Sequence, residues 1–110
     1  LYAGLKALEA ADQGGVNIAY GSDLLGDMWK WQSKEFEIRS QVQSAGAVLR
    51  SATTVAARLL NQEGELGIIR EGAQADIVLL NANPLDDITV LAEPNQSVRN
   101  VFVRGGLVLE

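Results

Sequence analysis

The chain has 110 residues, of which 47% are apolar and 21% charged, and its formal net charge is -5. This composition excludes a largely disordered chain, and an acidic chain without a Lys/Arg cluster argues against a nucleic-acid partner. The sequence has no cysteine and no histidine, which excludes disulfides and thiolate–zinc sites and leaves carboxylates as its main metal ligands. No apolar run approaches the roughly 20 residues of a membrane span; localisation is unknown, with the cytoplasm slightly favoured.

The first elements are typical of one half of an α/β unit. Residues 1–13 predict the end of a helix, because leucines recur at helical spacing and Gly14–Gly15 supply a stop. Residues 16–20 predict a short strand. Residues 24–32 have no clear period and predict a loop.

Two helices are predicted next. Ser33 is a plausible N-cap for a helix over about 34–43, and the following helix, over about 47–61, has one broad apolar face. Charged residues on the first of these helices predict a solvated face with modest ion pairing: Lys34, Glu35, Glu37 and Arg39.

Glycines separate short segments of the sequence beyond a boundary near residues 62–67. We therefore expect one unit over 1–62 and a β-rich unit over 63–110. Strands are predicted over 76–80 and 98–104, and Gly105–Gly106 predict a two-residue hairpin into the last apolar residues. Residues 81–87 predict a loop, followed by a short helical turn over 88–91.

The order of these elements predicts a fragment, or a chain that pairs with another chain. The predicted strand over 16–20 has no partner of its own kind in this sequence. Unpaired strand edges attract other chains, so we expect self-association if this piece is studied alone.

Asp23 is the sharpest candidate for chemistry. It lies just past the carboxyl end of the predicted strand over 16–20, where functional groups gather in α/β folds. A carboxylate there can ligate a metal or accept a proton from metal-bound water. The alternative is that Asp23 caps the loop or the next turn, as aspartate commonly does.

Several segments, in order along the chain, resemble the metal-dependent amidohydrolase superfamily, near its imidazolonepropionase and Xaa-Pro dipeptidase members. They comprise a strand ending in Gly-Ser-Asp, an Ala-Thr helix, a Gly-x-Ile-x-x-Gly-x-x-Ala-Asp signature, an Asn-Pro-Leu segment and a closing hairpin. Their positions are 16–23, 49–57, 67–80, 83–88 and 101–109.

The resemblance implies the last strand and helices of a (β/α)₈ TIM barrel over 1–62, and part of a small composite β-sandwich over 63–110. It implies one or two divalent ions, usually zinc, whose other ligands, mostly histidines, would precede Leu1. Asp23 matches the aspartate of the eighth barrel strand, which serves as metal ligand and catalytic group. The implied activity is hydrolysis of a C–N bond in a small amide or dipeptide substrate by metal-activated water, with this fragment inactive alone.

Other candidates carry weaker hypotheses. Trp29 and Trp31 follow the strand and are candidates for a stacking substrate subsite; alternatively, they pack the loop onto the barrel end. We expect Asp76 to accept backbone N–H bonds in a turn, and Asp86 or Asp87 to cap the turn over 88–91. The competing function for the whole chain is a non-catalytic β-rich binding or assembly module.

Overall fold

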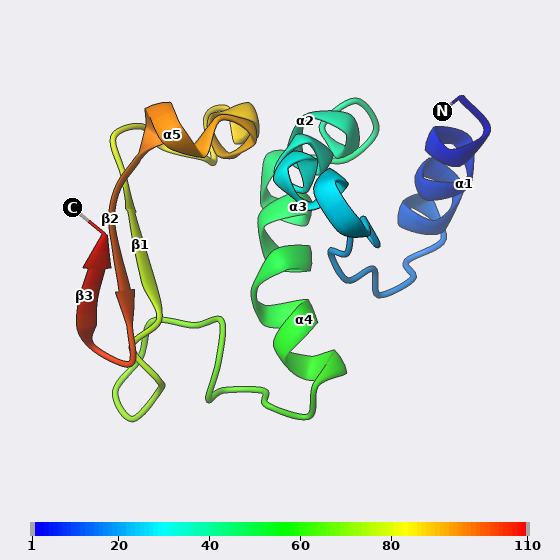
Figure 1. The fold of residues 1–110 in the computed structure, drawn as a ribbon. Helices are drawn as coiled ribbons and strands as arrows, with labels where there is room; N and C mark the ends of the chain where they lie inside the picture. Colours follow the sequence, from blue (N-terminus) through cyan, green and yellow to red (C-terminus); the bar gives the residue numbers. More distant parts are fainter. Residues whose placement is uncertain (1, 110) are drawn as a thin grey trace.

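The structure is a computed structural model that describes residues 2–109. Helices occupy the first half of the chain and a sheet occupies the end, as Figure 1 shows. In chain order the elements are α1 (Tyr2–Gln13), the 3₁₀ helix η1 (Gly26–Trp31), α2 (Lys34–Arg39), α3 (Ala45–Ala52), α4 (Thr54–Leu59), β1 (Ile77–Leu80), the 3₁₀ helix η2 (Ile88–Ala92), α5 (Pro94–Ser97), β2 (Val98–Val103) and β3 (Gly106–Leu109). No helix in this described part is long and apolar enough to cross a membrane.

The glycine stop after α1 is confirmed. Gly15 has φ +71, and its N–H donates to the Asp12 carbonyl at 3.1 Å. The Val16 N–H donates to the Ala11 carbonyl at 3.0 Å. This pair of bonds is the Schellman motif, which satisfies carbonyls that the helix end would otherwise leave free. Leu1, the predicted first residue of this helix, lies outside the described residues.

The prediction of a strand over 16–20 is wrong for this structure. The segment is irregular and pairs with no strand among residues 2–109. Its one long-range backbone bond runs from the Tyr20 N–H to the Ser51 carbonyl of α3, at 2.9 Å. Strand geometry needs a hydrogen-bonded neighbour, and the sequence pattern indicated the apolar character of the segment without supplying one.

The helices predicted over 34–43 and 47–61 begin and end at other residues in the structure. The first ends at Arg39 rather than near 43, and the second begins at Ala45, where the Ser44 hydroxyl caps it by accepting from the Ala47 N–H. The second helix is broken at Thr53, whose φ and ψ are -125° and -94°. The Thr53 hydroxyl donates to the Leu49 carbonyl at 2.8 Å, a bond that competes with regular helix geometry.

The loop predicted over 24–32 also needs correction, because most of it forms η1. The 3₁₀ helix has six residues, which is longer than the three or four that such helices usually reach, and it holds both tryptophans. Glycine at its start lowered the helical signal in the sequence: Gly26 has φ +56 and makes the turn into the helix.

Three antiparallel strands form the sheet in the order β1-β2-β3, which confirms the predicted strands at 76–80 and 98–104 to within a residue. The hairpin between β2 and β3 differs by one position from its prediction. Val103 pairs with Gly106, so the two turn residues are Arg104 (φ +50) and Gly105 (φ +81). Two successive positive φ angles are the signature of a type I′ turn, which suits the twist of a hairpin.

Two aspartates serve the β-rich part structurally, as expected. The Asp76 carboxylate accepts from the Arg104 N–H at 2.8 Å and thereby holds the hairpin turn, and this bond lowers the pKa of Asp76 below its usual 3.8. The Asp87 carboxylate accepts from the Thr89 N–H at 2.9 Å and caps η2. The predicted turn over 88–91 is confirmed.

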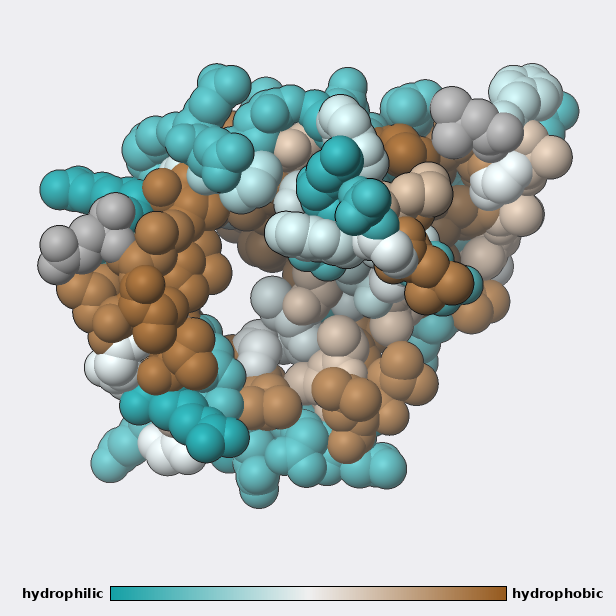
Figure 2. Space-filling view, viewed as in Figure 1, coloured by the Kyte–Doolittle hydropathy of each residue, from teal (hydrophilic) through white to brown (hydrophobic). Residues whose placement is uncertain are grey.

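The core is small for this chain length. Only Val48, Ala57, Ile88 and Ala92 are buried apolar residues among those described. The accessible surface is 7643 Å², whereas a compact protein of this mass exposes about 5,900 Å². Figure 2 shows apolar side chains over the sheet and an open space between the sheet and the helices. Six exposed apolar residues lie on the strands: Val78, Leu79, Val103, Leu107, Val108 and Leu109.

Candidate functional site

Asp23 lies in the irregular segment that joins residues 16–20 to η1. Its side chain is exposed, and its φ of +49 places the backbone in the left-handed region. Aspartate tolerates this region better than most residues, although it costs about 1 kcal/mol or more relative to ordinary geometry. No hydrogen bond or ion pair to its carboxylate occurs within residues 2–109. The carboxylate is therefore oriented by its backbone rather than by side-chain partners in this chain.

The residues that precede Asp23 are anchored firmly. The Tyr20 N–H donates to the Ser51 carbonyl of α3 at 2.9 Å, and the Tyr20 hydroxyl donates to the Gln32 carbonyl at 2.6 Å. The Arg39 guanidinium donates from Nη2 to the Ala19 carbonyl at 3.2 Å. Three bonds from three other parts of the chain thus fix the entry to the segment that carries Asp23.

Arg39 corrects the prediction of a solvated charged face on this helix. Only 7% of Arg39 is exposed. Its Nε and Nη2 lie 2.7 Å and 2.5 Å from Oε1 of Glu35, one helical turn earlier. The guanidinium carbon also lies 5.2 Å from the centre of the Tyr20 ring, within the range of a cation–π interaction.

Tyr20 completes this cluster from the other side. Its ring lies 4.5 Å from the ring of Phe36, centre to centre. Burial, reinforced by the Glu35 carboxylate and opposed by Arg39, raises the pKa of Tyr20 to about 12. The sequence did not predict this cluster. Glu35, Phe36 and Arg39 lie close together on α2, but no local spacing indicates that the Tyr20 ring packs against them.

Trp29 and Trp31 are both exposed, by 63% and 55%. They occupy η1, and the Lys30 ammonium lies 6.0 Å from the Trp31 ring. A small cavity of about 250 Å³ lies between η1 and the start of α5, with Trp31 and Pro94 in its wall. Lys34 and Glu93, which form an ion pair, also line it.

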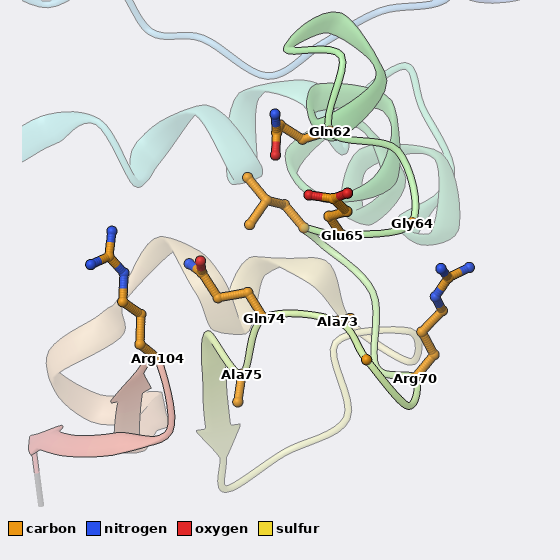
Figure 3. A pocket seen from close by; sticks show the side chains of 10 residues that line it. Gln62, Gly64, Glu65, Arg70, Ala73, Gln74, Ala75 and Arg104 are labelled. Atoms are coloured by element: carbon orange, nitrogen blue, oxygen red, sulfur yellow. The ribbon is translucent and has the colours of Figure 1, made fainter.

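A larger cavity lies elsewhere and is not lined by the predicted site residues. It measures about 680 Å³ and lies between the linking loop after α4 and the β2–β3 hairpin. Figure 3 shows the side chains of Arg70 and Arg104 at opposite ends of this opening, with Gln74 between them. Its charged groups do not converge on one point, so the geometry does not indicate a binding site.

The described residues do not form a metal centre by themselves. Among residues 2–109 there is no group of three or more His, Cys, Asp or Glu side chains that could hold a metal ion. A catalytic zinc ion commonly has three protein ligands. Asp23 is exposed and has no hydrogen-bond or ion-pair partner among the described residues, so its carboxylate fits the chemistry of one metal ligand but does not form a site alone.

Comparison with known proteins gives one consistent family. Residues 3–108 match the model of the Amidohydrolase family. An ochratoxinase from Aspergillus niger is 33% identical over 104 residues, which are 94% of this chain and 22% of that protein. The chain thus spans about a quarter of the length, or less, of the relatives that it matches.

Several solved structures are similar to this chain in both fold and sequence. A prolidase in complex with N-methylphosphonate-L-proline is 48% identical with a TM-score of 0.92, over 97% of this chain and 26% of that one. A Xaa-Pro dipeptidase with methionine bound in its active site is 32% identical with a TM-score of 0.85, over 96% of this chain and 25% of that one. The resemblance stated from the motifs is confirmed, and the chain belongs to the amidohydrolase family.

Proposed function

We propose that this chain is the C-terminal part of a metal-dependent amidohydrolase that cleaves a C–N bond in a small peptide-like or cyclic amide. In this proposal residues 1–62 complete a (β/α)₈ barrel and residues 63–110 form part of a composite β-sandwich. The observation that carries the proposal is the position of Asp23 in a chain that matches the family over residues 3–108. Its carboxylate is exposed, its backbone is left-handed, and it follows an anchored segment.

Two structural features support the presence of further protein around this chain. The apolar segment over 16–20 has no strand beside it among the described residues. The surface exceeds that of a compact protein of this mass by about 1,700 Å², more than the roughly 800 Å² that one partner buries in a standard interface. A barrel wall beside residues 16–20 and a second sheet over β1–β3 would account for both.

The role that we propose for Asp23 follows from its chemistry. A bound divalent ion, most simply zinc, would supply an activated water molecule. Asp23 would contribute one oxygen ligand and hold the proton that passes to the leaving amine, because a carboxylate can accept a proton and return it. Trp29 and Trp31 would offer flat apolar surfaces to the substrate at the mouth of the site.

The relatives narrow the substrate class. Prolidase and Xaa-Pro dipeptidase structures are similar to this chain along almost its whole length, and their bound molecules are small amino-acid derivatives. We therefore propose a dipeptide, with an Xaa-Pro bond as the first choice, or an amide whose amine half is an amino acid. The chain of 110 residues alone would be inactive, because one carboxylate does not hold a catalytic zinc ion.

The test is Asp23→Asn in the full-length enzyme, assayed with Xaa-Pro dipeptides and N-acyl amino acids. Loss of a general acid/base lowers kcat by about 10²- to 10⁴-fold. Asp27→Asn is a matched control, because Asp27 is an exposed carboxylate four positions further along, on η1. Full activity of Asp23→Asn would refute the proposed role and favour the non-catalytic binding or assembly module.

A further inference from the structure

The hydroxyl of Tyr20 joins two parts of the candidate site that are separate in the sequence. Tyr20 ends the anchored segment three residues before Asp23, and Gln32 follows η1, which carries Trp29 and Trp31. The hydrogen bond from Tyr20 Oη to the Gln32 carbonyl, at 2.6 Å, therefore closes a loop that contains all three candidate site residues.

We propose that Tyr20 is a positioning residue: its hydroxyl holds the tryptophan-bearing loop against the segment that carries Asp23 and so sets substrate affinity. The hydrogen bond from Tyr20 Oη to the Gln32 carbonyl is called the clasp below. The inference rests on the proposed roles of Asp23, Trp29 and Trp31. Tyr20 itself would contact neither substrate nor metal. Its effect would reach the substrate through the position of η1.

The aromatic ring of Tyr20 is held from two sides, so its hydroxyl has a defined direction. Phe36 packs against the ring at 4.5 Å between centres, and the Arg39 guanidinium lies 5.2 Å from its centre. Arg39 is fixed in turn by Glu35 and by the Ala19 carbonyl. A donor that is already oriented loses little entropy when it bonds, so the clasp retains most of its free energy.

Few other bonds hold the loop between Tyr20 and Gln32: besides the Tyr20 hydroxyl, the Gln32 carbonyl accepts from the Glu35 N–H of α2 at 3.3 Å. From Leu25 to Lys30, each of the six residues is exposed, and within the loop the Met28 N–H donates to Leu25 and the Gln32 N–H to Trp29. Exposed segments with few bonds open readily on their own. Removal of the clasp would therefore loosen η1 more than any other part of the described chain.

The clasp would act over the whole neutral range. Because burial raises the pKa of Tyr20 to about 12, the phenol stays protonated and remains a donor at all ordinary assay pH values. The acceptor is a backbone carbonyl, which does not titrate. Any effect of losing the hydroxyl should thus be constant from about pH 6 to pH 9, unlike the effect of a proton-transferring group.

Tyr20→Phe is the decisive variant, because it keeps the ring with its Phe36 and Arg39 contacts and removes only the donor. We expect KM of the full-length enzyme to rise by about two- to tenfold, as the loss of one hydrogen bond predicts, with kcat changed less than twofold. A purely structural role would instead lower the amount of active enzyme and leave KM unchanged.

A second measurement does not depend on activity. In the full-length enzyme without substrate, hydrogen exchange of the Met28 and Gln32 amides should accelerate by about two- to tenfold in Tyr20→Phe. The Val48 amide, buried in α3, should exchange at its native rate. A fluorinated tyrosine at position 20, which is a stronger donor on a similar ring, should slow exchange in the loop and keeps the test valid if the phenylalanine variant misfolds.

Tyr2→Phe is the matched control, because it removes the hydroxyl of an exposed tyrosine that lies outside the candidate site. It should change neither KM nor loop exchange. Unchanged exchange, or unchanged KM, in Tyr20→Phe would overturn the inference. An active Asp23→Asn would instead refute the proposed function while the exchange result still reported on the clasp.

Discussion

Gly67 offers a sharp stability test, because it lies against the break between α3 and α4. A Cβ added at Gly67 would lie 2.6 Å from both the C and O atoms of Thr53, and Gly67 itself has φ +67. Thr53 cannot retreat easily, because its own backbone is displaced from helical geometry at the junction of two helices. The close approach of the two backbones thus holds the linking loop against the helical part.

The expected loss of unfolding free energy in Gly67→Ala is the sum of two terms. A positive φ costs an alanine about 1–2 kcal/mol, and forcing atoms into filled space costs about 1–3 kcal/mol. Gly67→Ala should therefore lower the free energy of unfolding by about 2–5 kcal/mol. Gly72→Ala is the matched control: Gly72 has φ +84 in the same loop, but a Cβ there would meet nothing within 4 Å. It should cost only the conformational term, about 1–2 kcal/mol.

Urea denaturation followed by far-ultraviolet circular dichroism measures both variants at one protein concentration, so that association does not shift the midpoints. The difference between the variants isolates the clash, because the conformational terms nearly cancel. Equal losses in the two variants would refute the close approach of Gly67 to Thr53. So would a Gly67→Ala variant as stable as the native chain.

The remaining predictions concern a charge, a helix cap and the exposed sheet. The bond from the Arg104 N–H lowers the pKa of Asp76 below 3.8 in the folded state, so the unfolded chain binds the proton first as the pH falls. The stability that this carboxylate gives above about pH 4 is therefore lost as the pH falls through the lowered pKa. Urea midpoints measured against pH should show this acid-sensitive component in the native chain and not in Asp76→Asn. Ser44→Ala should lower the free energy of unfolding by about 0.5–2 kcal/mol because it removes a cap, whereas Ser33→Ala should have almost no effect because the Ser33 side chain makes no capping bond. The 110-residue chain alone should self-associate through its exposed apolar strands, which sedimentation velocity at rising concentration would detect; a monomer throughout would contradict this.

Elements that depend on local signals were predictable from the sequence. The strands β1 and β2, the glycine stop after α1 and the cap of η2 each follow from residues close to one another. The break at Thr53 was not predictable, because the apolar period of the helix runs through it undisturbed. The distortion reflects a bond to Leu49 and the approach of Gly67, a residue fourteen positions further along.

The candidate site was predictable only in part. The position of Asp23 after an apolar segment followed from the pattern, and its exposure is consistent with that prediction. The segment before it did not become a strand, because a strand depends on neighbours rather than on its own residues. Tyr20 and Arg39 meet only when α2 packs beside residues 18–20, so no local spacing indicates their contact.

The cluster around Arg39 differs in kind from the apolar core. Nη1 of Arg39 is buried and has no hydrogen-bond partner within residues 2–109, and an unmade bond of this kind costs about 1–3 kcal/mol. An apolar side chain of similar volume would avoid that cost, yet it could not donate to the Ala19 carbonyl or face the Tyr20 ring with a charge. Polar contacts have fixed directions, whereas apolar packing tolerates displacement. A guanidinium here thus gives up some stability for contacts of fixed direction to Ala19 and Tyr20, which shortly precede Asp23. Under the proposed function, this fixed direction would help to place Asp23 relative to the other groups of the site.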